Sequence, residues 1–150
     1  MSSDRIEKRI FLRAPRARVW RALTVPEEFG RWFGARFDAG TVFQPAARID
    51  AGITHPGYEH WRFQIVIERV EPETLFSYRW HPYPKPGADL SGEPMTLVEL
   101  RLSEAPGGTE LSVVESGFDQ VLPARRDEAF RMNEGGWAAQ LENIARHVAS

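Results

Sequence analysis

The feature that most constrains the fold is a change of hydrophobic period along the 150 residues of the chain. Up to about residue 118, apolar residues alternate with polar ones in several short runs, which is typical of strands with one buried face. From about 123 to 149 the period becomes helical, because apolar residues recur three and four positions apart. These helical positions are Phe130, Trp137, Leu141, Ile144 and Val148. The pattern predicts a sheet followed by one long helix.

The alternating runs predict seven strands. The clearest run places Trp61, Phe63, Ile65 and Ile67 on one face. Other strands are predicted at 5–13, 35–37, 47–54, 75–80, 96–102 and 111–115. Short turns such as Pro106-Gly107-Gly108 join most of the successive strands, so neighbouring strands are expected to be antiparallel.

Two short helical stripes follow the first strand. Val19 and Leu23 belong to the first stripe and Phe29 and Trp32 to the second, and Pro26 separates them. One apolar face of the sheet needs a cover, and the terminal helix is the only predicted element long enough to supply it. We therefore predict an α+β fold in which the C-terminal helix covers one face of a curved antiparallel sheet. No linker or repeat divides the chain, so residues 1–150 are expected to form one domain.

Composition excludes several classes of function. The formal net charge is −2 and the basic residues are dispersed among acidic ones, which argues against nucleic acid as a partner. Without cysteine there is no disulfide, thiolate nucleophile or thiolate metal site. No apolar run is long enough to span a membrane, and the N-terminus lacks a signal core, so no membrane partner and a cytoplasmic location are expected.

Several motifs resemble one known family. They are Ala14-Pro15-x-x-x-Val19-Trp20-x-Ala22-Leu23, Glu28-Phe29-x-x-Trp32-Phe33, Phe76-Ser77-Tyr78-Arg79-Trp80-His81-Pro82, Glu115-Ser116-Gly117-Phe118 and Asn133-Glu134-Gly135-Gly136-Trp137-x-x-x-Leu141. Together they resemble the activator-of-heat-shock-ATPase-like family of the START and birch-pollen-allergen (SRPBCC) superfamily. The resemblance covers nearly the whole chain and implies the helix-grip fold, with a cavity between sheet and helix. Members of the superfamily bind lipids, hormones or polyketides, a few are cyclases, and the namesake stimulates a chaperone ATPase.

The aromatic residues are the densest candidate for a binding site. Composition alone is equally consistent with a core and with a cavity lining, and the resemblance favours the cavity. The predicted lining consists of Trp32, Phe33, Phe37, Trp61, Phe63, Tyr78, Trp80, Phe118, Phe130, Glu134, Trp137 and Leu141.

Glu134 and Glu115 are the candidate polar groups among these apolar positions. Glu134 lies four residues after Phe130 and three before Trp137, so its carboxylate is predicted to point toward the cavity or its mouth. Glu115 shares the parity of Leu111 and Val113. His60, His81 and Glu115 are predicted to lie at a polar rim of the cavity. The sequence is consistent both with a structural ion pair and with an acid–base pair among these polar residues.

Other kinds of site lack their sequence signals. The four histidines, His55, His60, His81 and His147, have no metal-ligand spacing, so no metal is expected. Neither a phosphate-binding glycine loop nor a G-x-S-x-G frame is present, and no cofactor is expected.

Three functions remain. The first is a binding protein for a small apolar or aromatic ligand, which we expect to be non-catalytic. The second is a cyclase- or dehydratase-like enzyme that uses the same cavity. The third is a module that binds a chaperone or another protein through the segment from His81 to Pro94, which holds four prolines and two glycines.

Overall fold

The computed structural model describes residues 4–149, and its elements follow the predicted order. The first half contains β1 (Arg5–Leu12), α1 (Arg16–Thr24), α2 (Pro26–Phe33), β2 (Ala35–Arg36) and β3 (Arg48–Ile53). The second half contains β4 (Arg62–Glu71), β5 (Leu75–Trp80), β6 (Thr96–Ala105), β7 (Gly108–Ser116), the 3₁₀ turn η1 (Phe118–Gln120) and α3 (Pro123–Ala149). The predicted α+β class is confirmed.

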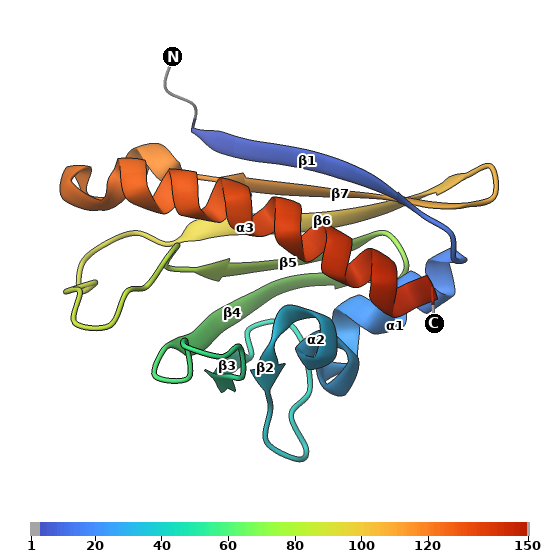
Figure 1. Ribbon diagram of the computed structural model, residues 1–150, viewed down its shortest axis with the longest axis horizontal. Coiled ribbons are helices and arrows are strands. Elements are labelled where there is room, and N and C mark those ends of the chain that lie inside the picture. Colours follow the sequence, from blue (N-terminus) through green and yellow to red (C-terminus); the bar gives the residue numbers. More distant parts are fainter. Residues whose placement is uncertain (1–3, 150) are drawn as a thin grey trace.

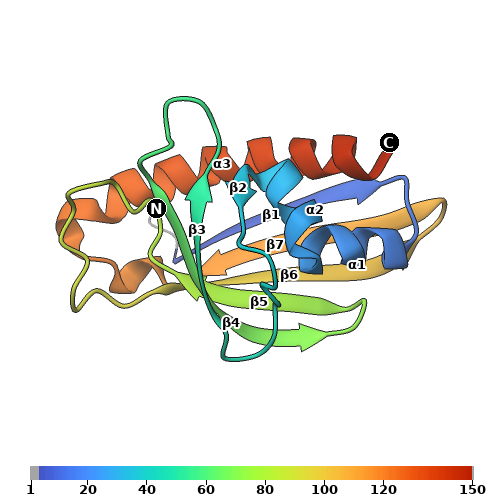
Figure 2. The same cartoon turned by 90° about the horizontal axis from the view of Figure 1, so that it is seen from below.

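The seven strands of the described chain form one antiparallel sheet in the order β1-β7-β6-β5-β4-β3-β2. Its first strand lies at one edge, beside β7, because Arg5 to Leu12 pair with Ser116 to Thr109. The sheet curves, and α3 lies along its inner face while α1 and α2 cover the far end (Figures 1 and 2). This is the helix-grip arrangement that the resemblance implied.

The break between α1 and α2 follows from Pro26, which occupies the first turn of α2. Gly34 ends α2 in the left-handed conformation, with φ of 94°. Gly30 lies against the chain that leaves the helix, since a Cβ there would lie 2.2 Å from the carbonyl oxygen of Ala35. These two glycines turn the chain from α2 directly into β2, and Phe33 is thereby placed over the sheet.

The buried stripe of α3 drifts around the helix. In its N-terminal half the inward positions are spaced by four, from Ala129 through the half-buried Asn133 to Trp137, and Leu141, Ile144 and Val148 continue the stripe. A Cβ at Gly135 or Gly136 would meet no atom within 4 Å, so no other element of the described chain packs closely against these two adjacent glycines. Within residues 4–149, no helix combines the length and the apolar character needed to cross a bilayer.

Candidate functional site

A cavity of about 500 Å³ opens between β3, β4 and the segment that follows β5. Phe33 of α2 and Asn133 of α3 close it from the helical side. Most of the remaining wall is apolar or aromatic. The lining residues are Phe33, Arg48, Ile49, Asp50, Ile53, Trp61, Arg62, Phe63, Gln64, Ile65, Val66, Trp80, His81, Tyr83, Pro84, Leu90, Met95 and Asn133.

The cavity exists because β4 and β5 separate. Their last paired residues are Val66 and Arg79, and residues 62–65 of β4 extend beyond this point without a β5 partner. The backbone of Ile67 bonds to the β3 side, at Ala46 and Ala47, so the alternate residues Val66 and Gln64 direct their backbone groups toward β5. Among the described backbone hydrogen bonds, none joins Gln64 to His81. The sheet therefore opens here, and residues from both of its faces reach the wall.

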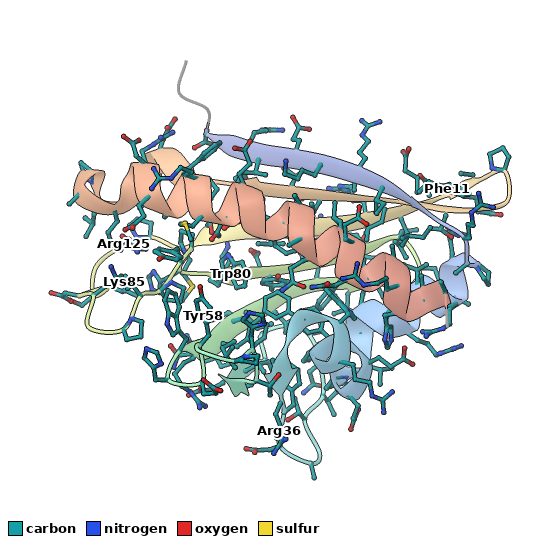
Figure 3. The ribbon with its side chains drawn as sticks, in the orientation of Figure 1. Phe11, Arg36, Tyr58, Trp80, Lys85 and Arg125 are labelled. Atoms are coloured by element: carbon teal, nitrogen blue, oxygen red, sulfur yellow. The ribbon has the colours of Figure 1, made fainter. Side chains whose placement is uncertain are left out.

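The deep wall of the cavity is an aromatic cluster. The ring of Phe33 lies 5.0 Å from that of Phe63 and 6.1 Å from that of Trp80, centroid to centroid. Near the mouth, Trp61 packs against Tyr83 with centroids 5.1 Å apart. Trp80 lies beneath α3 in the interior, whereas Lys85 of the following loop extends outward (Figure 3).

Behind the wall, Glu115 is fully buried and accepts hydrogen bonds from four side chains. The indole Nε1 of Trp80 donates to its Oε2 at 2.8 Å, and that of Trp137 donates to its Oε1 at 2.9 Å. The hydroxyl of Thr96 donates at 2.6 Å, and the Nδ2 of Asn133 lies 3.0 and 3.2 Å from the two oxygens. All these donors are neutral, so the carboxylate is stabilised by hydrogen bonds rather than by a cation.

Tyr78 neighbours this carboxylate. Its hydroxyl is buried and has no hydrogen-bond partner among the described residues. Burial and the negative charge of Glu115 both raise the pKa of the Tyr78 phenol well above its ordinary value. Tyr78 therefore stays neutral at neutral pH.

Glu134 is exposed, so the prediction that its carboxylate points into the cavity is wrong. The spacings to Phe130 and Trp137 place it near the inward face only if that face runs straight along the helix. Because the buried stripe drifts, its neighbour Asn133 takes the inward position and lines the cavity. The polar residue of α3 that lines the cavity is thus one position earlier than expected.

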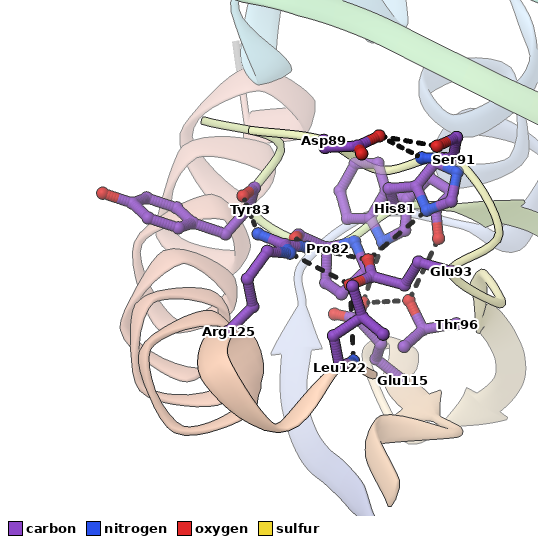
Figure 4. A network of polar contacts seen from close by, with 11 residues as sticks. His81, Pro82, Tyr83, Asp89, Ser91, Glu93, Thr96, Glu115, Leu122 and Arg125 are labelled. Carbon is purple, nitrogen blue, oxygen red and sulfur yellow. Dashed lines mark hydrogen bonds and ion pairs between the residues drawn. The ribbon is translucent and has the colours of Figure 1, made fainter. Parts of the chain in front are cut away.

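A second buried carboxylate, Glu93, anchors the loop after β5, and sequence reasoning missed it. Arg125 of α3 donates from Nε and Nη2 to Glu93 at 3.0 and 2.9 Å, and to the carbonyl oxygens of Pro82 and Tyr83 (Figure 4). Burial raises the pKa of Glu93, but the hydrogen bonds and charge of Arg125, helped by the Leu122 N–H and by His81, outweigh it and hold that pKa below the ordinary value. Arg125 stands beside Arg126 and before Asp127 and Glu128, a charge run typical of a solvated helix face, yet its side chain is only 15% exposed.

His81 lies between this anchor and the cavity. Its Nδ1 is 3.5 Å from Oε2 of Glu93, within ion-pair range but without a hydrogen bond. The ring also lines the cavity. His60, in contrast, is exposed in the turn before β4 and is not among the lining residues, whereas its neighbour Trp61 is.

The structure thus brings five of the predicted site residues to the cavity, namely Phe33, Trp61, Phe63, Trp80 and His81. The others lie elsewhere. Trp32 bonds to the Ala22 carbonyl, and Phe37 packs on Phe29 in the core beneath α2. Phe118 and Phe130 pack on each other near the start of α3. Tyr78, Trp137 and Leu141 are buried core, and Glu115 lies behind the wall rather than at a rim.

In the described part of the chain, no three histidine or acidic side chains gather closely enough to hold a metal ion. The wall offers a small molecule the aromatic rings and a few polar side chains, which are Arg48, Asp50, Arg62, Gln64, His81 and Asn133.

Comparison with solved structures supports the fold. Protein MLL2253 from Mesorhizobium loti superposes with a TM-score of 0.75 at 21% identity, over 97% of this chain and 96% of that one. A solution structure of a protein from Arthrobacter aurescens gives 0.78 at 16% identity, over 97% and 86%. DynU16, from the dynemicin biosynthetic locus, gives 0.73 at 22% identity, and this chain covers 48% of its length.

Comparison of the sequence itself identifies the family. A comparison with curated proteins found no match. Residues 13–149, however, match the family described as Activator of Hsp90 ATPase homolog 1-like protein. The match spans both short helices, most of the sheet and α3, and it agrees with the resemblance of the motifs. The chain belongs to the Activator of Hsp90 ATPase homolog 1-like family.

Proposed function

We propose that this protein binds a small apolar or aromatic molecule in the cavity between β3, β4, α2 and α3. The observation that carries the proposal is a space of about 500 Å³ walled mainly by aromatic and aliphatic side chains. Ligand pockets for small molecules typically have roughly 300–1,000 Å³ and a few polar groups on apolar walls. The family is one that usually binds hydrophobic ligands.

Filling the cavity tests this function. Ile53 is half-buried on the wall, and its replacement by tryptophan would place an indole in the space that a ligand needs. We expect Ile53→Trp to weaken binding of 2-naphthol at least tenfold in calorimetric titration while the protein stays folded. The matched control is Ile10→Trp, on β1 and away from the cavity, which should bind like the wild type. Equal binding by wild type and Ile53→Trp would place the ligand elsewhere.

Acid–base chemistry on the bound molecule is a second candidate function. It is favoured by His81, whose Nδ1 faces the buried Glu93 while the ring lines the cavity. A histidine backed by a carboxylate is a common arrangement for proton transfer. Glu115 is a poorer candidate, since each of its oxygens already accepts from protein donors.

A substitution of His81 distinguishes a catalytic function from binding alone. If the protein catalyses a reaction, His81→Gln should abolish turnover and still bind 2-naphthol. The measurement compares small-molecule extracts incubated with each protein, by mass spectrometry. A compound consumed by the wild type alone supports catalysis, and no consumption by either protein leaves binding as the function.

Binding of a protein partner through the segment from His81 to Pro94 would be favoured by an exposed apolar patch on that segment. Within residues 4–149, the large exposed apolar side chains are Phe11, Val42, Tyr58, Leu122 and Met132, and none lies between 81 and 95. The loop instead turns Tyr83, Leu90 and Met95 toward the cavity.

A further inference from the structure

The amide of Asn133 is held in one orientation. One of its terminal atoms lies 3.0 and 3.2 Å from the two oxygens of Glu115. An ionised carboxylate can only accept hydrogen bonds, so the atom facing it must be the Nδ2 donor. The carbonyl oxygen Oδ1 consequently faces away from Glu115.

This oxygen is available to a ligand. Asn133 is half-buried and lines the cavity, and no hydrogen bond from a described residue reaches its Oδ1. The neighbouring donors cannot turn to serve it, because Trp80, Trp137 and Thr96 all donate to Glu115. At this end of the cavity Trp80 presents an aromatic ring, and Asn133 presents a hydrogen-bond acceptor.

We propose that the ligand is an aromatic or similarly apolar molecule with a hydroxyl or N–H donor, such as a phenol or enol, that donates to Asn133 Oδ1. Asn133 is then the specificity-determining residue, and Glu115 is a positioning residue that fixes the amide. The inference rests on the proposed function, since it concerns the same cavity. An acceptor-only ligand would leave Oδ1 desolvated and unpaired, which lowers its affinity.

A matched pair of probes tests the contact. 2-Naphthol carries a hydroxyl donor, and 2-methoxynaphthalene has the same ring system without one. Their affinities are measured by calorimetry, with the ether in competition against 2-naphthol. We expect the preference for the naphthol over the ether to fall about five- to tenfold from the wild type to Asn133→Leu, which is the size of one net hydrogen bond. Asn133→Ala should give the same fall if the leucine variant folds poorly.

Thr96→Val is the control for damage to the network. It removes a different donor from Glu115, and Thr96 is absent from the cavity wall, so the wild-type preference should remain. An unchanged preference in the Asn133 variants would overturn the inference and leave the binding function standing. An equal fall in Thr96→Val would also overturn it, because the effect would then come from the network. If the wild type binds neither probe, the proposed function and the inference both fail.

Discussion

Replacing Glu115 by glutamine is expected to destabilise the protein by about 3 kcal/mol, although the two side chains have the same shape. All four partner side chains of Glu115 donate hydrogen bonds, two of them through indole nitrogens that can only donate. A glutamine must turn its own amide hydrogens toward one of these indoles. One buried N–H is then left facing another donor, and the favourable charge-assisted bonds are lost.

Urea denaturation of the wild type and the variant measures this loss. Glu110→Gln is the matched control on the same strand, because the Glu110 side chain is 46% exposed and its pair with Arg9 spans 3.9 Å. Such a surface pair contributes little, so the control should lose less than about 1 kcal/mol. A loss as small in Glu115→Gln would contradict the shared-acceptor role of its carboxylate.

Glu115 and Glu134 show which side-chain positions can be predicted from the sequence and which cannot. Strand parity correctly predicted that Glu115 faces inward with Leu111 and Val113, because side chains alternate strictly along a strand. Helix spacing failed for Glu134, since a long helix on a curved sheet does not keep one straight buried face. The difference is one residue, yet it replaces a carboxylate by an amide at the cavity.

The structure of the segment after β5 could be predicted from the sequence only in part. Its prolines and glycines predicted a loop, and the structure has no helix or strand between Trp80 and Thr96. The bond between Glu93 and Arg125 joins residues 32 positions apart. No local pattern distinguishes these two residues from exposed charges, because their burial depends on how the loop meets α3. Similarly, the aromatic residues were predicted as a group, while the separation of β4 from β5 decides which of them face a cavity.

Arg125→Met is expected to cost about 3–5 kcal/mol at neutral pH, the range for removing one partner of a buried ion pair. Methionine retains the apolar stem, but Glu93 keeps a negative charge, and its side chain is fully buried. The carbonyl oxygens of Pro82 and Tyr83 also lose their donors. Adding Glu93→Leu should recover most of the loss, because the double variant has no buried charge. Arg131→Met, at an exposed position of the same helix, is the control.

The pH dependence of this loss identifies its cause. In the wild type the pKa of Glu93 is lowered, so its ionisation stabilises the fold above the ordinary pKa of the carboxyl, and this contribution disappears as the pH falls through the folded-state value. Without Arg125, burial is largely unopposed and raises that pKa, so the fold of the variant is weakened as the pH rises. Urea denaturation at pH 4 and pH 7 should therefore show a smaller difference between wild type and Arg125→Met at pH 4. A difference that does not change with pH would mean that Arg125 stabilises the loop through the two carbonyl oxygens and not through the charge of Glu93.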